Sequence, residues 1–279
     1  DEGGARAFRR GRGGVGKWGI NTQRDELVGA LMSLPSESPP ANLDSAAGDR
    51  VNGIRFGASD ATARNAWNVA NADRSLYGRA VANANAVFAT ALANVDNTDT
   101  LNGQSLGKLK GLARVANPKL SPVRVAQASN RHYFNVFCGP RLFNDLKEDL
   151  NTAHLAGRER NVDTNPVFQD GDLIYDGMMI REIPEIDTIR DANWTALDAA
   201  GAGGINLDPV FLCGQSALGM PWGMLPQPTR LKEDDYQHKQ GVGIEMMYGT
   251  GKLFAKVPKA GTALKQWGIA TGFFSYSTQ

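Results

Sequence analysis

Histidine and cysteine are scarce in this sequence, and their scarcity limits the chemistry that the chain can carry. His132, His154 and His238 are the three histidines, and none lies on one helix face with another metal ligand at a suitable spacing. Cys138 and Cys213 lie in apolar runs, which favours two buried reduced thiols over a disulfide. An extended strand would separate His132 from Cys138 by about 20 Å, at roughly 3.3 Å per residue. The sequence therefore predicts no metal site, no cofactor and no Cys–His nucleophile.

Long apolar runs and an excess of one charge are missing as well. No run approaches the roughly 20 apolar residues that cross a bilayer, and no secretory signal is visible, so we expect no membrane partner. The 30 basic and 29 acidic residues leave a net charge of +1, which argues against a dedicated nucleic-acid-binding protein. The absence of a regular βαβ rhythm and of internal repeats argues against Rossmann and barrel enzymes.

The first 50 residues are expected to form an arm. Residues 1–17 are rich in Gly and Arg with almost no apolar pattern, which favours a flexible segment. A short amphipathic helix is predicted at 22–34, and a Pro/Ser-rich linker at 35–50. Basic side chains of the arm could lie against DNA phosphate or pack on a neighbouring subunit, and the sequence leaves both open. These side chains are Arg6, Arg9, Arg10, Arg12 and Lys17.

Residues 11–17 (GRGGVGK) match the first seven positions of a phosphate-binding P-loop. That site needs a buried strand before the loop and a Ser or Thr after the Lys to hold magnesium. Trp18 stands in place of the hydroxyl residue, and residues 6–10 are no buried strand. A nucleotide-binding enzyme therefore stays only as an alternative.

Acidic residues do not form a catalytic pair in the sequence. Four aspartates are better explained as helix caps and turn residues than as groups for general acid–base chemistry. They are Asp60, Asp73, Asp96 and Asp99. The acidic run at 233–235 is interpreted as a solvated turn, a cation site, or a partner for a basic patch on a neighbour. No catalytic residue is assigned, and the chain is not expected to be an enzyme.

Helices and strands are expected in separate blocks, as in an α+β fold. Apolar spacing over 71–95 predicts the longest helix, about 37 Å at roughly 1.5 Å per residue. Further expected elements are, in chain order, a helix at 106–116 that Pro118 ends, a strand at 133–138, a helix from Pro140, a hairpin at 173–180 around Asp176-Gly177, a strand at 210–213 and antiparallel strands from 241 onward.

Several short motifs, taken in order, resemble those of tailed-bacteriophage major capsid proteins, especially the branch that includes coliphage N4. The main ones are YFNVFCGP at 133–140, NPVF at 165–168, IYDGMMIRE at 174–182 and FLCGQSAL at 211–218. Weaker likenesses lie at 55–62, 121–125, 143–146, 222–223 and 243–254. Each motif is short, and the resemblance rests on their order and spacing across 51–254.

The resemblance implies the Hong Kong 97-type capsid fold, with an N-terminal arm, an extended β-loop, a peripheral domain with a long spine helix, and an axial domain. On this chain the arm would be 1–50 and the extended loop 51–75. The peripheral domain would be 76–130 with 236–279, and the axial domain 131–235.

The same resemblance implies a major capsid protein that assembles as hexamers and pentamers into an icosahedral shell around double-stranded DNA. Implied partners are further copies of the chain, scaffold, portal and decoration proteins, and packaged DNA through non-specific contacts. The implied location is the virion capsid, after assembly in the host bacterial cytoplasm. The alternatives are an encapsulin-like or gene-transfer-particle shell protein, a minor virion protein such as a decoration module, and the nucleotide-binding enzyme.

Overall fold

The computed structural model describes nine stretches of the chain, and the structural statements below concern these alone. They are residues 2–34, 51–52, 54–56, 59–125, 131–158, 168–169, 172–228, 243–256 and 264–276. Their helices are α1 (Glu2–Leu31), α2 (Ala61–Ala70), α3 (Phe88–Ala93), α4 (Gly103–Val115), α5 (Pro140–Arg158) and α6 (Pro184–Asn193), with 3-10 turns η2 (Ala72–Arg74), η3 (Val81–Asn83) and η5 (Thr195–Leu197).

The strands fall into one large sheet and several small ones. The large sheet contains β4 (Ser75–Tyr77), β5 (Val123–Val125), β6 (Arg131–Cys138), β7 (Phe168–Gln169), β8 (Asp172–Tyr175), β9 (Met178–Glu182), β10 (Leu207–Cys213) and β17 (Ile269–Ser275). The small sheets contain β1 (Ser33–Leu34), β2 (Val51–Asn52), β3 (Ile54–Arg55), β11 (Leu218–Gly219), β12 (Trp222–Pro228), β13 (Ile244–Tyr248), β14 (Thr250–Lys252), β15 (Phe254–Lys256) and β16 (Leu264–Gln266).

The large sheet has the strand order β4-β17-β10-β6-β9-β8-β7, with β5 added beside β6. Its centre is antiparallel: β10 pairs with β17 from Leu207↔Ser275 to Cys213↔Ile269, and with β6 on its other side. Parallel pairs occur between β6 and β9 and between β4 and β17. This mixture of parallel and antiparallel strands confirms the α+β class.

Both faces of the sheet are covered by helices. Successive residues of a strand point to opposite faces of the sheet, and apolar residues occur on both. On β10, Val210 and Leu212 belong to the core under α4 and α5. Phe211 and Cys213 belong to a second core with α2, α3, α6 and the end of α1. The body is therefore a sheet between two helical layers.

Local sequence signals account for several elements. Asp176 and Gly177 have φ angles of 45° and 68°, as the tight turn between β8 and β9 requires. Asp60 caps α2 by accepting a hydrogen bond of 2.7 Å from the Ala63 amide. Asn102 and Ser105 form a reciprocal capping box at the start of α4. The predicted β8–β9 hairpin, the strand 133–138, the helix from Pro140 and the helix 106–116 are confirmed.

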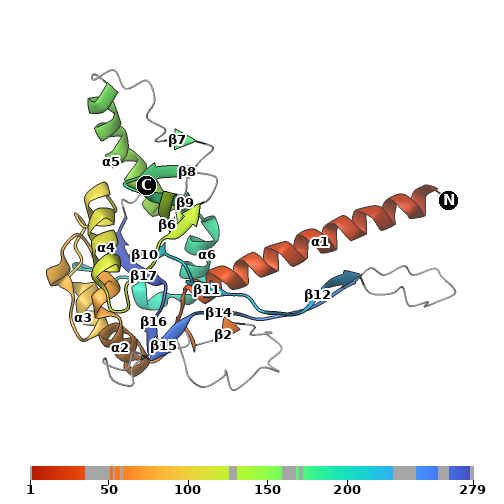
Figure 1. Ribbon diagram of the computed structural model, residues 1–279, viewed down its shortest axis with the longest axis horizontal. Coiled ribbons are helices and arrows are strands. Elements are labelled where there is room, and N and C mark those ends of the chain that lie inside the picture. Colours follow the sequence, from red (N-terminus) through yellow and green to blue (C-terminus); the bar gives the residue numbers. More distant parts are fainter. Residues whose placement is uncertain are drawn as a thin grey trace.

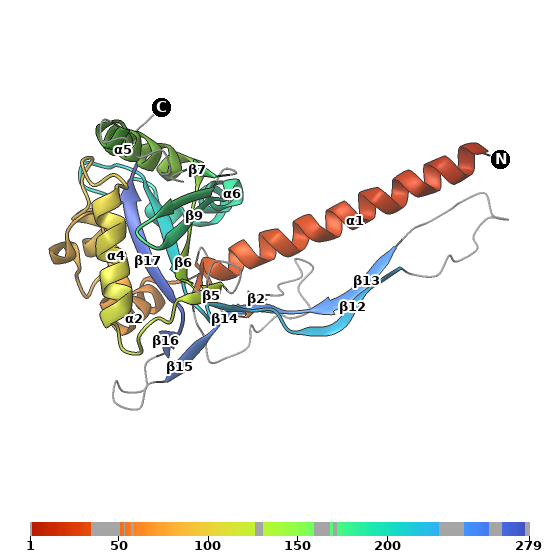
Figure 2. The ribbon, with the colours of Figure 1, turned by 45° about the horizontal axis from the view of Figure 1, so that its top comes forward.

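Two segments project from the body in the same direction. In Figures 1 and 2, α1 and the β12–β13 hairpin extend to the right, whereas α3 and α4 lie at the opposite end of the body. At about 1.5 Å per residue, the 30 residues of α1 span roughly 45 Å. None of the described helices combines the length and the apolar character needed to cross a membrane.

The predicted continuous helix at 71–95 is wrong. The segment folds as η2, β4, η3 and α3, because Ser75–Tyr77 join the sheet beside β17. Gly78 then turns the chain with a φ of +62°, and Asn83 Nδ2 donates a 3.0 Å hydrogen bond to the Tyr77 carbonyl. The apolar spacing that resembled a helix arises from pairing and packing with the sheet.

The predicted flexible segment at 1–17 is also wrong, since α1 begins at Glu2 and continues to Leu31. The helix predicted at 22–34 is the end of this longer one. The helix can be this long because the first proline, which would break a helix, is Pro35, and because arginine is a good helix former. The many glycines concealed this continuity.

The structure also revises the expected division into domains. Strand β17, from the segment assigned to a peripheral domain, pairs along its whole length with β10, from the segment assigned to an axial domain. Strand β4 adds beside β17 in the same sheet. Residues 61–70, expected in an extended loop, form α2 and pack in the core. The expected boundaries at 75, 130 and 235 therefore do not separate folding units.

Candidate assembly surfaces

Helix α1 is anchored to the body at its C-terminal end. Val28, Leu31 and Met32 are each at most 3% exposed and belong to the core that also contains α6. Arg24 Nη1 forms a 3.0 Å ion pair with Glu185 of α6. The body therefore holds the last two turns of α1 in a fixed direction.

The hairpin accompanies α1 away from the body. Gln23 Nε2 lies 3.3 Å from Met246 Sδ on β13. Gly19 lies beside the same side chain, since a Cβ there would be in ordinary van der Waals contact with Met246 Cε, at 3.9 Å. Near the base of the hairpin, the rings of Trp222 and Tyr248 pack with centroids 5.2 Å apart. Helix and hairpin thus form one projecting unit.

Large apolar side chains on this unit face solvent. The most exposed are Ile20 (68%), Leu225 (65%), Met247 (64%) and Trp18 (59%). Burying such side chains contributes about 25 cal/mol for each Å² removed from water. Several large exposed apolar side chains on one projecting unit indicate a surface that another protein covers.

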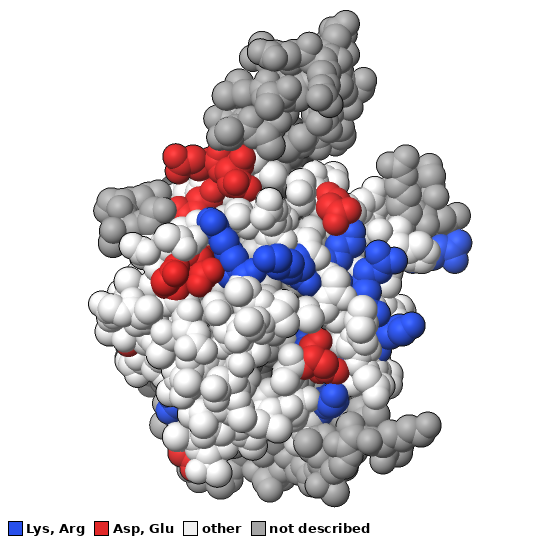
Figure 3. Space-filling view, turned by 90° about the vertical axis from the view of Figure 1, so that its left-hand side faces the viewer, with Lys and Arg blue, Asp and Glu red and all other residues white. Residues whose placement is uncertain are grey.

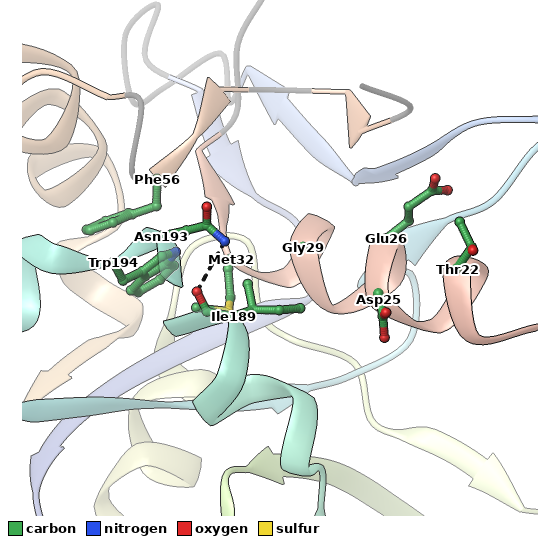
Figure 4. Close-up of a pocket in the computed structure, with 9 residues that line it drawn as sticks. All are labelled: Thr22, Asp25, Glu26, Gly29, Met32, Phe56, Ile189, Asn193 and Trp194. Carbon is green, nitrogen blue, oxygen red and sulfur yellow. Dashed lines mark hydrogen bonds between the residues drawn. The ribbon is translucent and has the colours of Figure 1, made fainter. Parts of the chain in front are cut away.

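A pocket of about 250 Å³ lies where α1 meets α6 (Figure 4). Met32, Phe56, Ile189 and Trp194 converge on one end, and the rings of Phe56 and Trp194 stack with centroids 3.9 Å apart. Toward the projecting part of α1 the lining becomes polar, with Thr22, Asp25 and Glu26. The pocket is a cleft between an apolar wall and an acidic helix face.

Buried charges fix α6 and α5 to the sheet. Asp208 of β10 is fully buried, and Arg141 Nε lies 3.1 Å from its Oδ2. Arg190 of α6, 2% exposed, lies 2.9 Å from its Oδ1. Burial raises the pKa of Asp208 to about 7, assisted by Asp187 and Asp191 and opposed by the two arginines. The arrangement resembles a structural ion network, since each charge is used to join elements.

The predicted basic residues lie in the projecting part of α1. Lys17 is exposed, and Arg6, Arg9, Arg10 and Arg12 lie in the helix, although their side chains are outside the described set. The P-loop-like residues 11–17 are therefore helical, so their amides are engaged along the helix and form no phosphate cradle. The structure gives no support to the nucleotide-binding alternative.

The structure places one histidine side chain and both cysteines. His132 is exposed at the start of β6; the side chain of His154 and the whole of His238 are outside the described residues, as is the run 233–235. Cys138 and Cys213 are buried and unpaired, as predicted, and they belong to the cores on opposite faces of the sheet. Burial raises the pKa of the Cys213 thiol to about 12 and that of Cys138 further.

Of the four acids predicted as caps and turns, Asp60 and Asp96 have those roles, whereas Asp73 and Asp99 also bond residues far away in the sequence. Asp60 caps α2. Asp96 and Asp99 bond backbone amides, with Asp99 Oδ1 accepting from Arg79 N at 2.7 Å. Asp73 accepts a 2.9 Å hydrogen bond from Asn117 N and pairs with Arg74. Within the described part of the chain, no three His, Cys, Asp or Glu side chains are grouped closely enough to hold a metal ion.

The exposed apolar side chains of the projecting unit are typical of a structural protein that assembles through its surface. Residues 41–271 match the family model described as phage capsid protein. The chain belongs to this phage capsid protein family. No curated protein sequence matches the chain.

Solved capsids share the fold. The cyanophage Pam1 capsid is 31% identical, covering 98% of this chain and 70% of that chain, with a TM-score of 0.77. The capsid of Ralstonia phage GP4 is 14% identical, covering 98% and 68%, with a TM-score of 0.62. The head of Helicobacter pylori bacteriophage KHP40 is 10% identical, covering 97% and 69%, with a TM-score of 0.57. The fold is the Hong Kong 97-type capsid fold, and the chain is a major capsid protein of a phage shell.

Proposed function

We propose that many copies of this chain assemble as hexamers and pentamers into an icosahedral shell that encloses double-stranded DNA. The observation that carries this proposal is the projecting unit of α1 and the β12–β13 hairpin, whose exposed apolar side chains need a protein partner. Contacts between different surfaces of identical copies close into rings, and small changes of angle give rings of five or six.

The sandwich-like body is the axial part of the subunit, and α1 with the hairpin is the peripheral part. Helix α1 then serves as the long spine helix, a role the sequence had placed at 71–95. This assignment is supported by the length of α1 and by its direction away from the large sheet. With this assignment, all strands of the large sheet belong to the axial part.

The chain acts by assembly and carries no catalytic step. Scaffold, portal and decoration proteins are its expected partners besides further copies, and assembly takes place in the host cytoplasm. The basic residues of α1 contact either packaged DNA or a neighbouring subunit. The encapsulin-like alternative is not favoured, because the family model and the solved matches above are phage capsids.

Electron microscopy of the expressed chain, with and without a scaffold, tests the proposal. Closed shells or capsomers are expected. A double variant Leu225→Glu/Met247→Glu should remain folded by circular dichroism but fail to assemble, because charges replace the exposed apolar contact. Val69→Glu is the matched control, since Val69 is 60% exposed but lies on α2 of the body. Discrete monomers of the unmodified chain under every condition would contradict the proposal.

A further inference from the structure

Basic charge is concentrated in one internal stretch of the chain. Residues 100–144 contain seven of the 30 basic residues and none of the 29 acidic ones. The stretch includes α4 and the paired strands β5 and β6. Lys and Arg side chains gather across the middle and along one edge of the face that carries α4, and Asp and Glu side chains form separate groups on that face (Figure 3). A chain with a net charge near zero therefore has a locally basic surface.

This surface contains a pocket of about 450 Å³. Leu120 and Phe134, 3% and 4% exposed, form an apolar floor. Four basic side chains from α4, the loop after it and β6 form the rim: Lys110, Arg114, Lys119 and His132. Arg124 extends the rim, because it lies opposite His132 in the β5–β6 pair and opposite residues point to the same face of a sheet. The pocket therefore combines positive charge with an apolar floor.

Most of the positive charge of the rim is uncompensated. Lys110 forms a 3.0 Å ion pair with Asp176. Arg114, Lys119 and Arg124 are exposed, and their side chains form no hydrogen bond or ion pair with any residue in the described stretches. These three cations are thus available to an anionic partner.

The exposed side of α4 is also bare of side chains. Gly107 and Gly111 lie four residues apart, and a Cβ at either position would meet nothing within 4 Å. Lys108 lies three residues before Gly111 and Arg114 three residues after it, so these basic side chains share that side of the helix. Glycine in a helix costs about 1 kcal/mol relative to alanine. In return, an extended polyanion can approach the helix backbone closely.

Acidic side chains of a second copy are the competing partner for this surface. Those on α6 and just before it already form ion pairs within their own chain. They are Glu182, Glu185, Asp187, Asp191 and Asp198. A contact with the basic surface would have to replace these pairs, so its net electrostatic gain would be small.

Double-stranded DNA fits the surface better than these acids do. It carries one negative charge per roughly 1.7 Å of its axis, and basic side chains that contact it release bound counterions, so no ion pair of the protein has to be replaced. The sugars between its phosphates supply apolar contact for the floor of the pocket. Contacts to phosphate and sugar need no particular base sequence, which suits a surface that meets a whole genome.

We propose that the face of the body that carries α4 lines the inside of the shell and binds the phosphate backbone of the packaged DNA. Arg114, Lys119 and Arg124 make the principal contacts, and Lys108 and His132 lie beside them. This face is at the end of the body opposite the projecting unit, so copies can meet through that unit while DNA lies against α4. The proposal rests on the proposed shell function and specifies which face turns inward.

Binding of a short fluorescent DNA duplex of mixed sequence to the whole chain, at several salt concentrations, tests the surface without assembly. The logarithm of the binding constant should fall linearly with that of salt, by about 0.9 for each phosphate contacted. Arg114→Gln/Lys119→Gln should reduce this slope by about 2. Arg24→Gln/Lys147→Gln is the matched control, since it removes the same charge at half-exposed sites that are paired with acids. Equal slopes for the natural chain and Arg114→Gln/Lys119→Gln, or equal reductions by both pairs of changes, would overturn the proposal.

Lysine acetylation then tests the orientation of the face in shells. Particles that contain DNA and particles emptied of it are treated with a small acetylating reagent, and mass spectrometry compares Lys119 with Lys147. We expect Lys119 to be modified several-fold less in the filled particles and Lys147 equally in both. Equal modification of Lys119 would refute the inward orientation.

The same variants separate this proposal from its competitor and from the shell function itself. Arg114→Gln/Lys119→Gln should form shells in normal yield. Normal duplex binding by this variant together with a loss of shells would assign the surface to a contact between copies, and the proposal would be wrong. Failure of the natural chain to form shells would refute the shell function, whereas the duplex slopes would still decide the DNA contact.

Discussion

Arg190 Nε lies 2.9 Å from Asp208 Oδ1, and both side chains are almost completely removed from solvent. Arg190 also donates hydrogen bonds to the carbonyl oxygen of Leu207, at 3.1 Å from Nε and 3.0 Å from Nη2. The pair joins α6 to β10, and α6 in turn contacts α1 through Glu185. The buried ion pair therefore fixes to the sheet the helix against which the end of α1 packs.

Arg190→Ala is expected to destabilise the chain by about 3 kcal/mol at pH 8, because it leaves the buried Asp208 carboxylate with less compensation. Urea unfolding followed by circular dichroism measures the change. Arg24→Ala is the control: its pair with Glu185 is half-exposed, so the expected cost is below about 1 kcal/mol. An equal loss of unfolding free energy in the two variants would contradict the expectation that the buried Arg190 pair stabilises the chain more than the half-exposed Arg24 pair.

Asp208 should make stability depend on pH. Burial raises the pKa of its carboxyl to about 7, so the folded state holds this proton more firmly than the unfolded state does. The contribution of Asp208 to the free energy of unfolding therefore falls as pH rises from about 4 to 7, and it levels off above pH 7. Asp208→Asn should lose this contribution and gain stability relative to the natural chain between pH 5 and pH 8. A constant difference across that range would contradict the raised pKa.

Phe273 lies at the centre of an aromatic cluster. Its ring is stacked on Tyr77 at 5.4 Å and meets Phe88 edge-on at 5.5 Å, and it is fully buried. Phe273→Ala should reduce the free energy of unfolding by about 3–5 kcal/mol through the cavity it leaves. Val115→Ala, at a site 81% exposed, should change it by less than about 0.5 kcal/mol. A small loss at Phe273 would mean that the cluster collapses around the cavity.

The two thiols are expected to be inert in the folded chain. Cys138 and Cys213 are buried on opposite faces of the sheet, and burial raises the pKa of Cys213 to about 12. Labelling with a maleimide should therefore proceed only after unfolding, and oxidation should yield no disulfide within one chain. Fast labelling of the folded protein at pH 7 would contradict the burial of these two thiols.

The sequence predicted those elements whose signals are local. Asp176-Gly177 supplies the backbone angles of a tight hairpin, Pro140 starts a helix, and strand β6 is rich in β-favouring residues. The order of such signals along the chain is also what resembles the capsid family. These features depend on nearby residues, so they survive without knowledge of the fold.

Features that depend on distant residues were not predicted. Apolar spacing over 71–95 could not reveal that Ser75–Tyr77 pair with β17, almost 200 residues later. The continuity of α1 was hidden by its glycines, and α6 was missed in a polar stretch. The pocket around Arg114 was missed too, although 45 consecutive residues without an acid were a readable signal. Tertiary pairing overrides local preference at each of these places.

In the proposed shell, the projecting unit of α1 and the β12–β13 hairpin makes the contacts between copies. A three-dimensional reconstruction of assembled particles tests this most directly. We expect neighbouring copies to cover four side chains of each copy: Trp18, Ile20, Leu225 and Met247. A shell in which these four side chains face solvent, while copies meet only through other parts of the body, would contradict it.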